Sequence, residues 1–496
     1  MQTRVAVLFG GQSVEHEVSI ISGLQAFAAL DRSRYVPIPL YITKDNRFYT
    51  GPHMGDVASY RDMPACLAMA TRVLPVPAEK GRVELVRYPF KKFGNNVVDS
   101  FDVALPVVHG TNTEDGTLMG FLEMLGVPYA SCDVTSSALG MDKYKMKAVL
   151  RQAGLPVLDA LLFSGREVAA DTAAAVSRIE SAFPYPVIVK PVNLGSSVGI
   201  SKAGDRDALG RALDLALSFS AEVLIERAIV PLRELNCAVL GDRDTARASV
   251  CEEPSGCDEI LSYQDKYLRG GKQAGAKSGG MASLGRRCPA DIPEELAARV
   301  QELAVRTFQA LGCSGCSRID FLNNPDTGEL FVNEINTIPG SLAFYLWEAA
   351  GTPFTALLDE MIALAFKRAR EREALTFSVD SNLLASVRLG GAKGGKIGYC
   401  GIGTAGYPAV FLWQDGTDAG TGGLQLVCCR HPARICCADR FPHRARGGTG
   451  SEPSRFEPGS HAQREEAPHA VRGFFPFFGG RKRTRTADLL RVKQAL

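Results

Sequence analysis

The segment FVNEINTIPG, residues 331–340, places two oxygen-bearing side chains on a hydrophobic strand that stops at a Pro-Gly turn. Residues two positions apart in a strand point to the same side, so Glu334 and Asn336 leave one face together. Carboxylate and amide oxygens are the ligands that a hard cation such as Mg²⁺ prefers. An edge strand with a solvated face explains the same pair, so this segment alone leaves both interpretations open.

The residues immediately upstream, CSRIDFLNNPDTGEL (316–330), predict a partner strand. Arg318 and Asp320 alternate with apolar residues, and the turn formers NNPDTG that follow predict a hairpin. Such a hairpin would bring Asp320 alongside Glu334 and Asn336. Arg318 would lie beside them. Two carboxylates, an amide and a guanidinium on one strand face are typical of sites for Mg²⁺ and phosphate.

Length and composition indicate a soluble globular protein. The 496 residues suffice for two to four domains, and 46% are hydrophobic and 22% charged. The net charge of +2 gives no general affinity for nucleic acid or membranes. The N-terminus shows no signal peptide, no apolar run approaches the ~18 residues of a membrane helix, and 13 cysteines without a secretion signal favour a reducing compartment. We therefore expect a cytoplasmic protein that binds neither nucleic acid nor a membrane.

The character of the sequence changes near Gly398. Up to Lys396 the chain has 42 basic and 46 acidic residues, whereas residues 397–496 have 14 basic residues, twelve of them arginine, and 8 acidic ones. This last fifth shows no sustained helical or strand periodicity. Its clustered cysteines in CCRHPARICC lack the C-x₂-C spacing of zinc sites. We expect a disordered or spurious extension that forms no compact domain and takes no part in catalysis.

Strand and helix patterns alternate over the first 130 residues. Strands are predicted in RVAVLFGG, YVPIPLYIT and FDVALPVVHG, residues 4–11, 35–43 and 101–110. The segment that follows Ser13 predicts a helix with this serine as N-cap. GTLMGFLEMLGVPYA (116–130) predicts a helix and a return strand. This alternation, with polar residues at strand ends, is typical of an open α/β sheet.

The centre of the chain contains a strand, a Gly/Ser loop and a second strand. This sequence, YPVIVKPVNLGSSVGISKA (185–203), lacks the helix that follows a Walker A loop. Its glycines would let backbone N–H groups turn towards an anion, Ser196 and Ser197 add hydroxyl donors, and Lys190 adds a charge. A plain hairpin turn would explain the loop alone. Lys143, in the predicted helix SSALGMDKYKMKAVLRQAGLPV, and the downstream hairpin favour a phosphate cradle.

The remainder, up to Lys396, alternates between regular elements and one long loop. Strands are predicted in EVLIERAI and ELNCAVLG, and helices in PEELAARVQELAVRTFQALG and FTALLDEMIALAFKRARE. The glycine-rich run at 269–285 is unsuited to a core, and its length favours an active-site lid or a linker. Cys313 and Cys316 have zinc or redox spacing but no second ligand pair, so we expect small buried thiols.

Seven motifs in these segments resemble the D-alanine–D-alanine ligases of the ATP-grasp superfamily. They are LFGGQSVEHEVSIISG, HGTNTEDGTLMGFLEMLGVPYA, MDKYKMK, VIVKPVNLGSSVGISK, QDKYL, SRIDF and NEINTIPG, in the family's order between residues 4 and 396. The implied fold is α/β. An N-terminal open α/β substrate domain (1–132) precedes a central ATP-grasp subdomain (133–225) and a C-terminal ATP-grasp catalytic domain (226–396), which hold ATP between antiparallel sheets, and a non-globular extension (397–496) follows.

The resemblance also implies a reaction. ATP phosphorylates the carboxylate of one D-alanine to an acyl phosphate, and the amine of a second D-alanine attacks it to give a peptidoglycan precursor. Both steps build negative charge on oxygen, so positioning and electrostatic stabilisation would dominate catalysis. The implied cofactors are ATP and two Mg²⁺ ions, for which Mn²⁺ can substitute. The implied partners are these small molecules, and a homodimer is compatible with the family.

The same motifs imply roles for single residues. Asp320, Glu334 and Asn336 would hold the metal ions. Arg318 and the amide of Gly340 would stabilise the developing oxyanion. The implied nucleotide contacts are Lys143, Lys190, Ser196, Ser197, Glu226, Arg227, Ile229, Glu234, Lys266 and Asn333.

The first substrate would be bound near the N-terminus. Glu15 matches the carboxylate that takes the ammonium group of this substrate, and Ser196 and Tyr267 complete a hydrogen-bonded triad with it. His109 matches a histidine near the substrate's carboxylate. Taken singly, each has a plainer interpretation: Glu15 as a helix-start residue, His109 as a structural histidine and Tyr267 as a loop aromatic.

The sequence departs from the family after NEINTIPG. There the family commonly has a short turn and then a Ser-Leu pair that holds the second substrate's carboxylate. Without gaps the serine position is Tyr345, whereas Ser341 and Leu342 come four residues early. All three are candidate second-substrate residues, and D-serine or D-lactate is an alternative second substrate.

Two other protein classes are disfavoured. A dehydrogenase would need G-x-G-x-x-G and an acidic residue at the end of a matching second strand, and neither is present. A nucleic-acid-binding role would depend on GGRKRTRTADLLR, but these basic residues are confined to the C-terminal extension.

Overall fold

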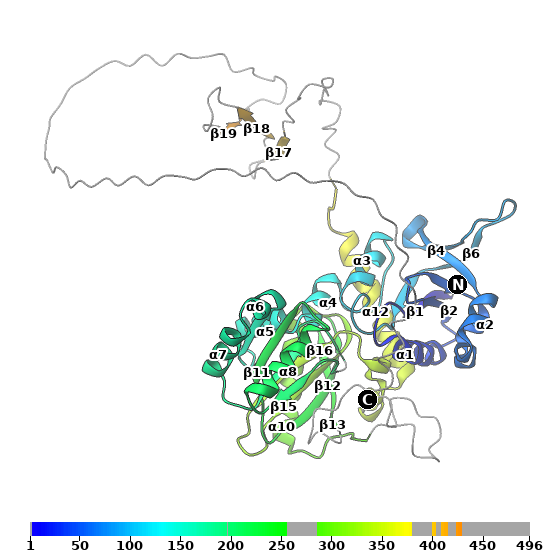
Figure 1. The fold of residues 1–496 in the computed structure, drawn as a ribbon. Coiled ribbons are helices and arrows are strands. Elements are labelled where there is room, and N and C mark those ends of the chain that lie inside the picture. The colour runs from blue at the N-terminus through cyan, green and yellow to red at the C-terminus, as the bar shows by residue number, and fades with distance from the viewer. Residues whose placement is uncertain are drawn as a thin grey trace, which may run out of the picture. The chain divides into compact units, whose positions relative to one another are not determined.

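The computed structural model describes residues 2–195, 197–254 and 285–378, and beyond them the backbone of three strands (Figure 1). The chain divides into two units, Met1–Val379 and Asp380–Leu496. The sequence does not predict the three strands of the second unit, and the expectation that this segment forms no compact domain lies mostly outside the described residues. The strands are β17 (Tyr399–Ile402), β18 (Pro408–Gln414) and β19 (Gly423–Cys428), paired antiparallel in that order.

A seven-stranded mixed sheet of order β6-β5-β4-β3-β2-β1-β7 forms the N-terminal part of the first unit. β1 (Thr3–Gly10) is parallel to β2 (Tyr35–Ile42) and β7 (Val103–Pro106), which confirms the open α/β arrangement. The other pairs are antiparallel, and the sequence does not predict this extension. The remaining elements are β3 (Phe48–Thr50), β4 (Thr71–Pro77), β5 (Val83–Arg87), β6 (Val97–Phe101), α1 (His16–Ala29), α2 (Met63–Met69) and α3 (Thr117–Met124).

Helix α1 packs closely on β1. A Cβ added at Gly23 would lie 2.5 Å from the Phe9 side chain, so only glycine allows this approach. The helix begins at His16, later than predicted. Ser13 does not cap it; its hydroxyl accepts a hydrogen bond of 3.1 Å from the Glu15 amide.

Two other predicted elements differ from the structure. The return strand expected after α3 is only an isolated bridge between Ala104 and Tyr129. The single helix expected from Ser136, ended by Gly154 and Pro156, is two helices, because the Asp142 side chain accepts a hydrogen bond from the Lys145 amide and starts a new helix. They are α4 (Val134–Met141) and α5 (Lys143–Gln152).

A four-stranded antiparallel sheet of order β10-β9-β11-β8 forms the central part. Its strands confirm the predicted strand–loop–strand segment. The sheet has its own apolar core, which includes Phe163, Ile179 and Leu213. The elements are β8 (Ala160–Ser164), β9 (Val187–Pro191), β10 (Ser201–Ala203), β11 (Glu222–Arg227), α6 (Gly165–Ala170), α7 (Thr172–Ala182) and α8 (Arg206–Leu217).

A five-stranded antiparallel sheet of order β14-β13-β12-β15-β16 forms the C-terminal part. Its hairpin and its two long helices confirm the predictions for these segments. The elements are β12 (Arg233–Gly241), β13 (Ala246–Pro254), β14 (Arg286–Arg287), β15 (Gly315–Asn323), β16 (Leu330–Asn336), α10 (Glu294–Ala310), the 3-10 turn η6 (Gly340–Ala343), α11 (Phe344–Ala349) and α12 (Phe354–Glu373).

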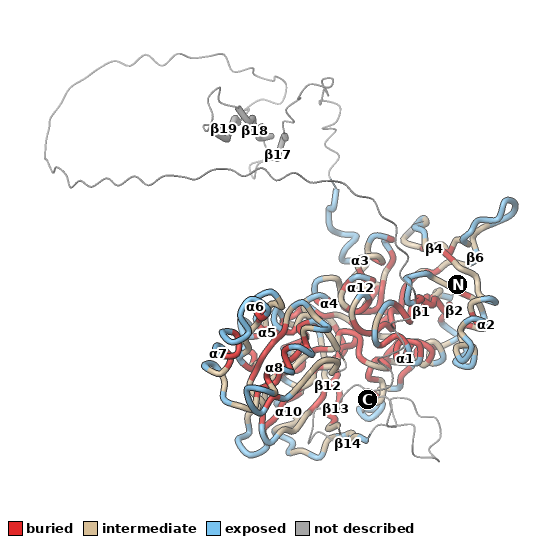
Figure 2. Tube along the Cα trace, in the orientation of Figure 1, coloured by how far each residue is buried: buried red, intermediate tan, exposed pale blue. Residues whose placement is uncertain are grey.

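Buried residues follow the strands, and exposed residues concentrate on turns and outer helix faces (Figure 2). Within the described ranges, no single helix has both the length and the apolar character to span a membrane. One pair of helices, Gly340–Ala349 and Phe354–Glu373, is long and apolar enough when taken together, but the two helices are bent by 119° relative to each other.

Candidate active site

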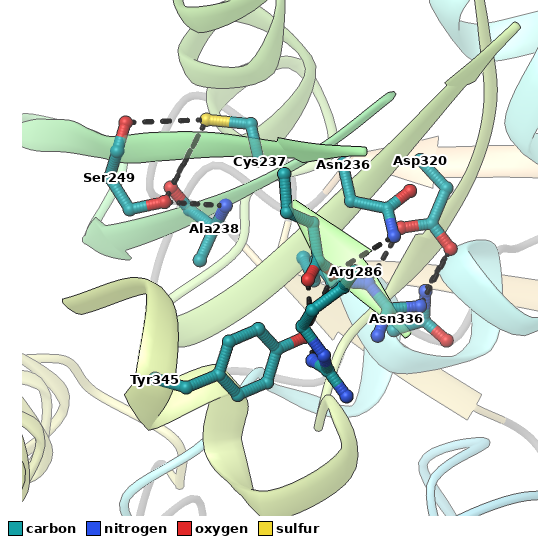
Figure 3. Close-up of polar contacts among 10 residues, drawn as sticks. Asn236, Cys237, Ala238, Ser249, Arg286, Asp320, Asn336 and Tyr345 are labelled. Carbon is teal, nitrogen blue, oxygen red and sulfur yellow. Dashed lines mark hydrogen bonds and ion pairs between the residues drawn. The ribbon is translucent and has the colours of Figure 1, made fainter. Parts of the chain in front are cut away.

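The hairpin of β15 and β16 brings the predicted metal donors together. The register pairs Asp320 with Glu334 and Arg318 with Asn336. Arg318 donates two hydrogen bonds of 2.7 Å to Asp320. The Asn336 amide donates a third, of 3.1 Å, to the same carboxylate (Figure 3). The predicted set therefore shares one strand face.

Burial and charge act together on this pair. Burial opposes the charge on Arg318, but the adjacent Asp320 outweighs it and raises the pKa of the guanidinium. Burial raises the pKa of Asp320; Arg318 opposes this rise, and the nearby carboxylates of Glu334 and Glu252 add to it. A cation placed among these carboxylates would relieve their repulsion.

A β-bulge gives Asn333 a partner outside the hairpin. The register shifts between Asp320 and Phe321, which leaves Asn333 as the extra residue on β16. Its Oδ1 accepts a hydrogen bond of 2.9 Å from Lys190 of β9. The bulge therefore connects the hairpin to the strand that leads into the Gly/Ser loop.

Two lysines share the buried carboxylate of Glu226. Lys190 donates to its Oε1, and Lys147 Nζ lies 3.0 Å from its Oε2. The side chains of Lys147 and Glu226 are only 2% and 1% exposed. Burial opposes the ionisation of Glu226, but the two ammonium groups outweigh it and lower the pKa of the carboxyl to about 2. The Glu226 carboxylate is therefore ionised at neutral pH. Burial lowers the pKa of Lys147, and the charge of Glu226 opposes this shift. The carboxylate holds both lysine side chains in place.

Lys147 is a site residue that the sequence analysis missed. It follows Lys143 by four residues in MDKYKMK, so both lie on one face of α5. This spacing of four residues was the signal in the sequence that could have identified Lys147. Glu226, predicted to contact adenine or ribose, here orients the two lysines, and its contact with a nucleotide stays a prediction.

Lys143 connects the Gly/Ser loop with the hairpin. Its Nζ donates a hydrogen bond of 2.6 Å to the Leu194 carbonyl and lies 3.2 Å from Glu334 Oε2. The cap at Asp142 makes Lys143 the first residue of α5. The break between α4 and α5 therefore positions this lysine.

Glu15 lies against the Gly/Ser loop. A Cβ added at Gly195 would lie 3.1 Å from Glu15 Oε2, and one added at Gly110 would lie 2.9 Å from the same atom. Both glycines permit the carboxylate to sit close to the backbone. Ser197 has a left-handed φ of 58°. The predicted Ser196, Lys266 and Tyr267, and the glycine-rich run up to residue 284, lie outside the described residues.

His109 is buried and uses both ring nitrogens. Its Nδ1 donates a hydrogen bond of 2.9 Å to the Ile338 carbonyl, and its Nε2 accepts one of 3.0 Å from the Ser22 hydroxyl. Burial lowers the pKa of His109 to about 4, so the ring is neutral at pH 7. His109 therefore fixes the loop after β16, and its contact with a substrate carboxylate stays a prediction.

The loop that follows contains three consecutive left-handed residues. Ser341, Leu342 and Ala343 have φ values of 52°, 53° and 49°. This conformation costs L-residues about 1–2 kcal/mol each. The Ser341 amide donates to Ser22 at 3.0 Å and its hydroxyl donates to Gln25 at 2.6 Å. Ser341 and Leu342 are fully buried in a turn that contacts α1, and their role towards a second substrate stays a prediction.

The predicted nucleotide segment begins at the end of β11. Arg227 forms an ion pair of 2.8 Å with Glu329. Ile229 belongs to a small apolar cluster with Leu322, separate from the main cores. Glu234 is the cross-strand partner of Leu322. An apolar patch next to charged groups is typical of a site for a planar base.

The donors on the hairpin fit a hard divalent cation. Asp320 and Glu334 contribute carboxylates and Asn336 an amide, an oxygen-only set that suits Mg²⁺ or Mn²⁺. In the part of the chain that the structure describes, no three His, Cys, Asp or Glu side chains form a metal-binding group, so the amide is needed. Cys313 and Cys316 are buried free thiols, as expected.

Comparison with known proteins gives consistent results along the chain. A family model described as "D-ala D-ala ligase N-terminus" matches residues 4–132, and one described as "D-ala D-ala ligase C-terminus" matches residues 149–363. The D-alanine–D-alanine ligase of Thermosipho africanus is 35% identical over 76% of this chain and 97% of its own. That of Acetivibrio thermocellus is 38% identical over 74% and 96%.

Solved structures agree with these sequence matches. The D-alanine–D-alanine ligase of Coxiella burnetii has a TM-score of 0.62 and 29% identity, over 75% of this chain and 96% of its own. The VanG D-Ala:D-Ser ligase of Enterococcus faecalis has a TM-score of 0.60 and 31% identity, over 74% and 100%. The described α/β fold with several sheets is therefore that of these enzymes.

Proposed function

The chain belongs to the D-alanine–D-alanine ligase family, and from that premise we propose that it joins two D-alanine molecules through an acyl phosphate to supply a peptidoglycan precursor. In the first step a carboxylate oxygen of one D-alanine attacks the γ-phosphorus of ATP, and the bond to ADP breaks. In the second step the amine of the other D-alanine attacks the acyl carbon, loses a proton, and the bond to phosphate breaks.

One observation carries the proposal. The β15–β16 register gathers Asp320, Glu334 and Asn336 beside Arg318, and the bulged Asn333 ties this face to Lys190. Oxygen donors for a cation, a guanidinium for an oxyanion and a lysine for phosphate thus belong to one connected network. Phosphoryl transfer followed by acyl transfer needs these three functions together.

Asp320, Glu334 and Asn336 are the residues that would hold two Mg²⁺ ions, or Mn²⁺ in their place. When bound, such ions neutralise phosphate charge and polarise the transferred phosphoryl group. Lys143 lies 3.2 Å from Glu334, so its charge and the cations would face the same phosphates. This arrangement supports ATP as the phosphoryl donor.

Lys190 and Lys143 would contact the phosphates of ATP. Lys190 is held between Glu226 and Asn333, and Glu226 is held in turn by Lys147. A charge that is fixed before the reaction needs little reorganisation as negative charge develops. Glu226 and Lys147 therefore act as positioning residues for Lys190. The segment with Arg227, Ile229 and Glu234 would take the adenine and ribose.

Arg318 would stabilise the oxyanion of the tetrahedral intermediate, together with the amide of Gly340. Its two bonds to Asp320 fix the plane of the guanidinium. Glu15 would hold the ammonium group of the first D-alanine next to the Gly/Ser loop. His109, neutral and bonded to Ile338, would keep the loop with Gly340 in register.

Phosphate release with ATP, Mg²⁺ and D-alanine tests the proposal. We expect release that depends on D-alanine and not on L-alanine, and a product with the mass of the D-alanine dipeptide. Added D-serine or D-lactate gives a mixed product only if the second site accepts it. A folded chain that binds ATP but releases no phosphate with any D-amino acid would contradict the proposal.

A further inference from the structure

A row of polar side chains crosses the C-terminal sheet beyond the predicted site. Glu252 of β13 pairs with Asn236 of β12, and Asn236 pairs with Asp320 of β15. Asp320 in turn pairs with Glu334 of β16. Directly opposed residues point to the same face of a sheet. Glu252 therefore lies on the face that carries the metal donors, about 10 Å from Asp320 at the usual strand spacing.

Glu252 organises three side chains at the end of this row. Its Oε1 accepts hydrogen bonds from the Tyr345 hydroxyl at 2.9 Å and from the Asn236 amide at 3.0 Å. Its Oε2 lies 3.3 Å from Arg286 Nη1. The Glu252 side chain is only 4% exposed. A buried carboxylate with these partners is a fixed anchor and is not part of a solvated surface.

The same anchor fixes Arg286 against an aromatic ring. The guanidinium carbon of Arg286 lies 4.1 Å from the centre of the Tyr345 ring. Figure 3 shows Arg286, Tyr345 and Asn236 together, next to Asp320 and Asn336. A guanidinium that is oriented by a ring and a carboxylate is prepared to bind a planar anion, because its N–H groups match both oxygens of a carboxylate.

The turn before Tyr345 explains why this group is needed. Ser341 uses its amide and its hydroxyl on Ser22 and Gln25, and Leu342 is fully buried in the left-handed turn. Both partners of Ser341 belong to α1 and not to the sheet face that carries Asp320. Tyr345, the first residue after this turn with a polar side chain, does lie at that face and touches Glu252.

We propose that Arg286, held by Glu252 and the ring of Tyr345, binds the α-carboxylate of the second, amine-donating substrate. Glu252 and Tyr345 act as positioning residues, because they orient the guanidinium of Arg286 and do not themselves bind the substrate. The ligand class is an α-amino acid with a free carboxylate. The inference rests on the proposed function and identifies the residues of its second-substrate site.

Two alternative nucleophiles, assayed in parallel, distinguish an effect on the second-substrate site from an effect on the formation of the acyl phosphate. D-Alanine carries an α-carboxylate. Hydroxylamine carries none, yet its nitrogen attacks the acyl phosphate, releases phosphate and gives D-alanyl hydroxamate. Both products would be measured for the full chain and for Arg286→Gln. We expect the KM for the second D-alanine to rise at least tenfold, with hydroxamate formation changed less than twofold.

The neighbouring arginine provides a matched control. Arg287 lies on the same short strand but is 66% exposed and paired loosely with Asp291 at 3.7 Å. Arg287→Gln should leave both products unchanged. Arg286→Lys should recover part of the dipeptide rate because it keeps the charge without the planar fork. Tyr345→Phe removes only one hydroxyl and should raise the same KM by a smaller factor, with a melting temperature close to that of the unchanged chain.

Two results would overturn the inference. One is an equal fall of dipeptide and hydroxamate in Arg286→Gln, which would place Arg286 in the ATP-dependent step or in the stability of the fold. The other is an unchanged KM in both Arg286→Gln and Tyr345→Phe. If the unchanged chain forms neither product, the proposed function itself fails, so the two failures are distinguishable.

Discussion

Arg318 and Asp320, two residues apart on β15, form a bidentate ion pair in which both hydrogen bonds measure 2.7 Å. The pair fixes the guanidinium, but it also means that Asp320 has to serve Arg318 and a cation together. Glu334 lies opposite Asp320 and 3.2 Å from Lys143, so a substitution at Glu334 leaves the Arg318–Asp320 pair in place. The metal-binding role can therefore be tested most cleanly at Glu334.

Glu334→Gln should lower turnover at least a hundredfold, because an anionic donor becomes a neutral one. The melting temperature should change little, since the side chain is 25% exposed and keeps its shape. Phosphate release with D-alanine and a thermal melt measure the two effects. Glu302→Gln, on an exposed face of α10, is the control and should leave both unchanged. Full turnover in Glu334→Gln would remove Glu334 from the site.

Lys147→Met should destabilise the fold by about 3–5 kcal/mol, because it leaves Glu226 buried with only one of its two cations. Denaturant unfolding measures this free energy. Lys145→Met is the matched control two residues earlier on α5, where the side chain is 66% exposed, and it should change stability by less than ~0.5 kcal/mol. Equal effects of the two substitutions would show that the buried network contributes nothing specific.

Glu114→Gln should alter the dependence of stability on pH. Burial is the main cause that raises the pKa of Glu114 to about 7; hydrogen bonds from the amides of Ile338 and Gly110 oppose the rise, and the charge of Glu15 adds to it. The folded chain thus holds this proton more tightly than the unfolded chain. Its contribution is complete below pH ~4.5 and is lost as the pH rises through about 7, up to roughly 3 kcal/mol.

The comparison uses the slope of unfolding free energy between pH 5 and pH 8. The unchanged chain should lose stability over this range relative to Glu114→Gln, whose side chain does not titrate. His109 has the opposite sign: its lowered pKa of about 4 gives stability that is present above pH ~6.5 and lost as the pH falls. Parallel pH profiles for the two chains would show that Glu114 is ionised at the same pH in both states.

Removal of residues after Lys396 should leave turnover and melting temperature unchanged. The curated relatives are matched over 96–97% of their own length by about three-quarters of this chain, so their activity needs no counterpart of the last hundred residues. Steady-state kinetics and a thermal melt of the shortened chain provide the check. A clear loss of either property would assign the extension a role.

The hairpin at the site could be predicted because its signals are local. Polar residues alternate with apolar ones on each side of a turn-rich segment, so the sequence alone brings Asp320 to Glu334. The bulge at Asn333 could not be predicted, because it depends on how β16 meets β9. Lys147 and Glu226 are 79 positions apart in the chain, and no local pattern shows that a buried lysine on α5 will meet a carboxylate on β11.

The second-substrate residues illustrate the same limit. The row from Glu252 to Glu334 requires the strand order β13-β12-β15-β16, in which the pairing of β12 with β15 joins two hairpins that are far apart in the sequence. The left-handed turn at 341–343 was equally hidden, because it contains no glycine to signal a positive φ. Ser13 and Asp142 show that a short polar residue is not a sufficient signal for a helix start. Asp142 caps a helix and Ser13 does not, and the packing of the fold decides between the two outcomes.

The hydrogen bonds of Ser22 and His109 to the loop at Ile338 and Ser341 join positions 229 and 319 residues apart in the chain. Ser22 and His109 lie in the range that the N-terminal family model matches, and Ile338 and Ser341 lie in the range that the C-terminal one matches. Recombination between relatives would therefore succeed only when both sides of this contact come from the same parent. A chimera joined between these two ranges would combine the turn at residues 341–343 of one parent with helix α1 of the other, and the hydrogen bonds between them would be lost.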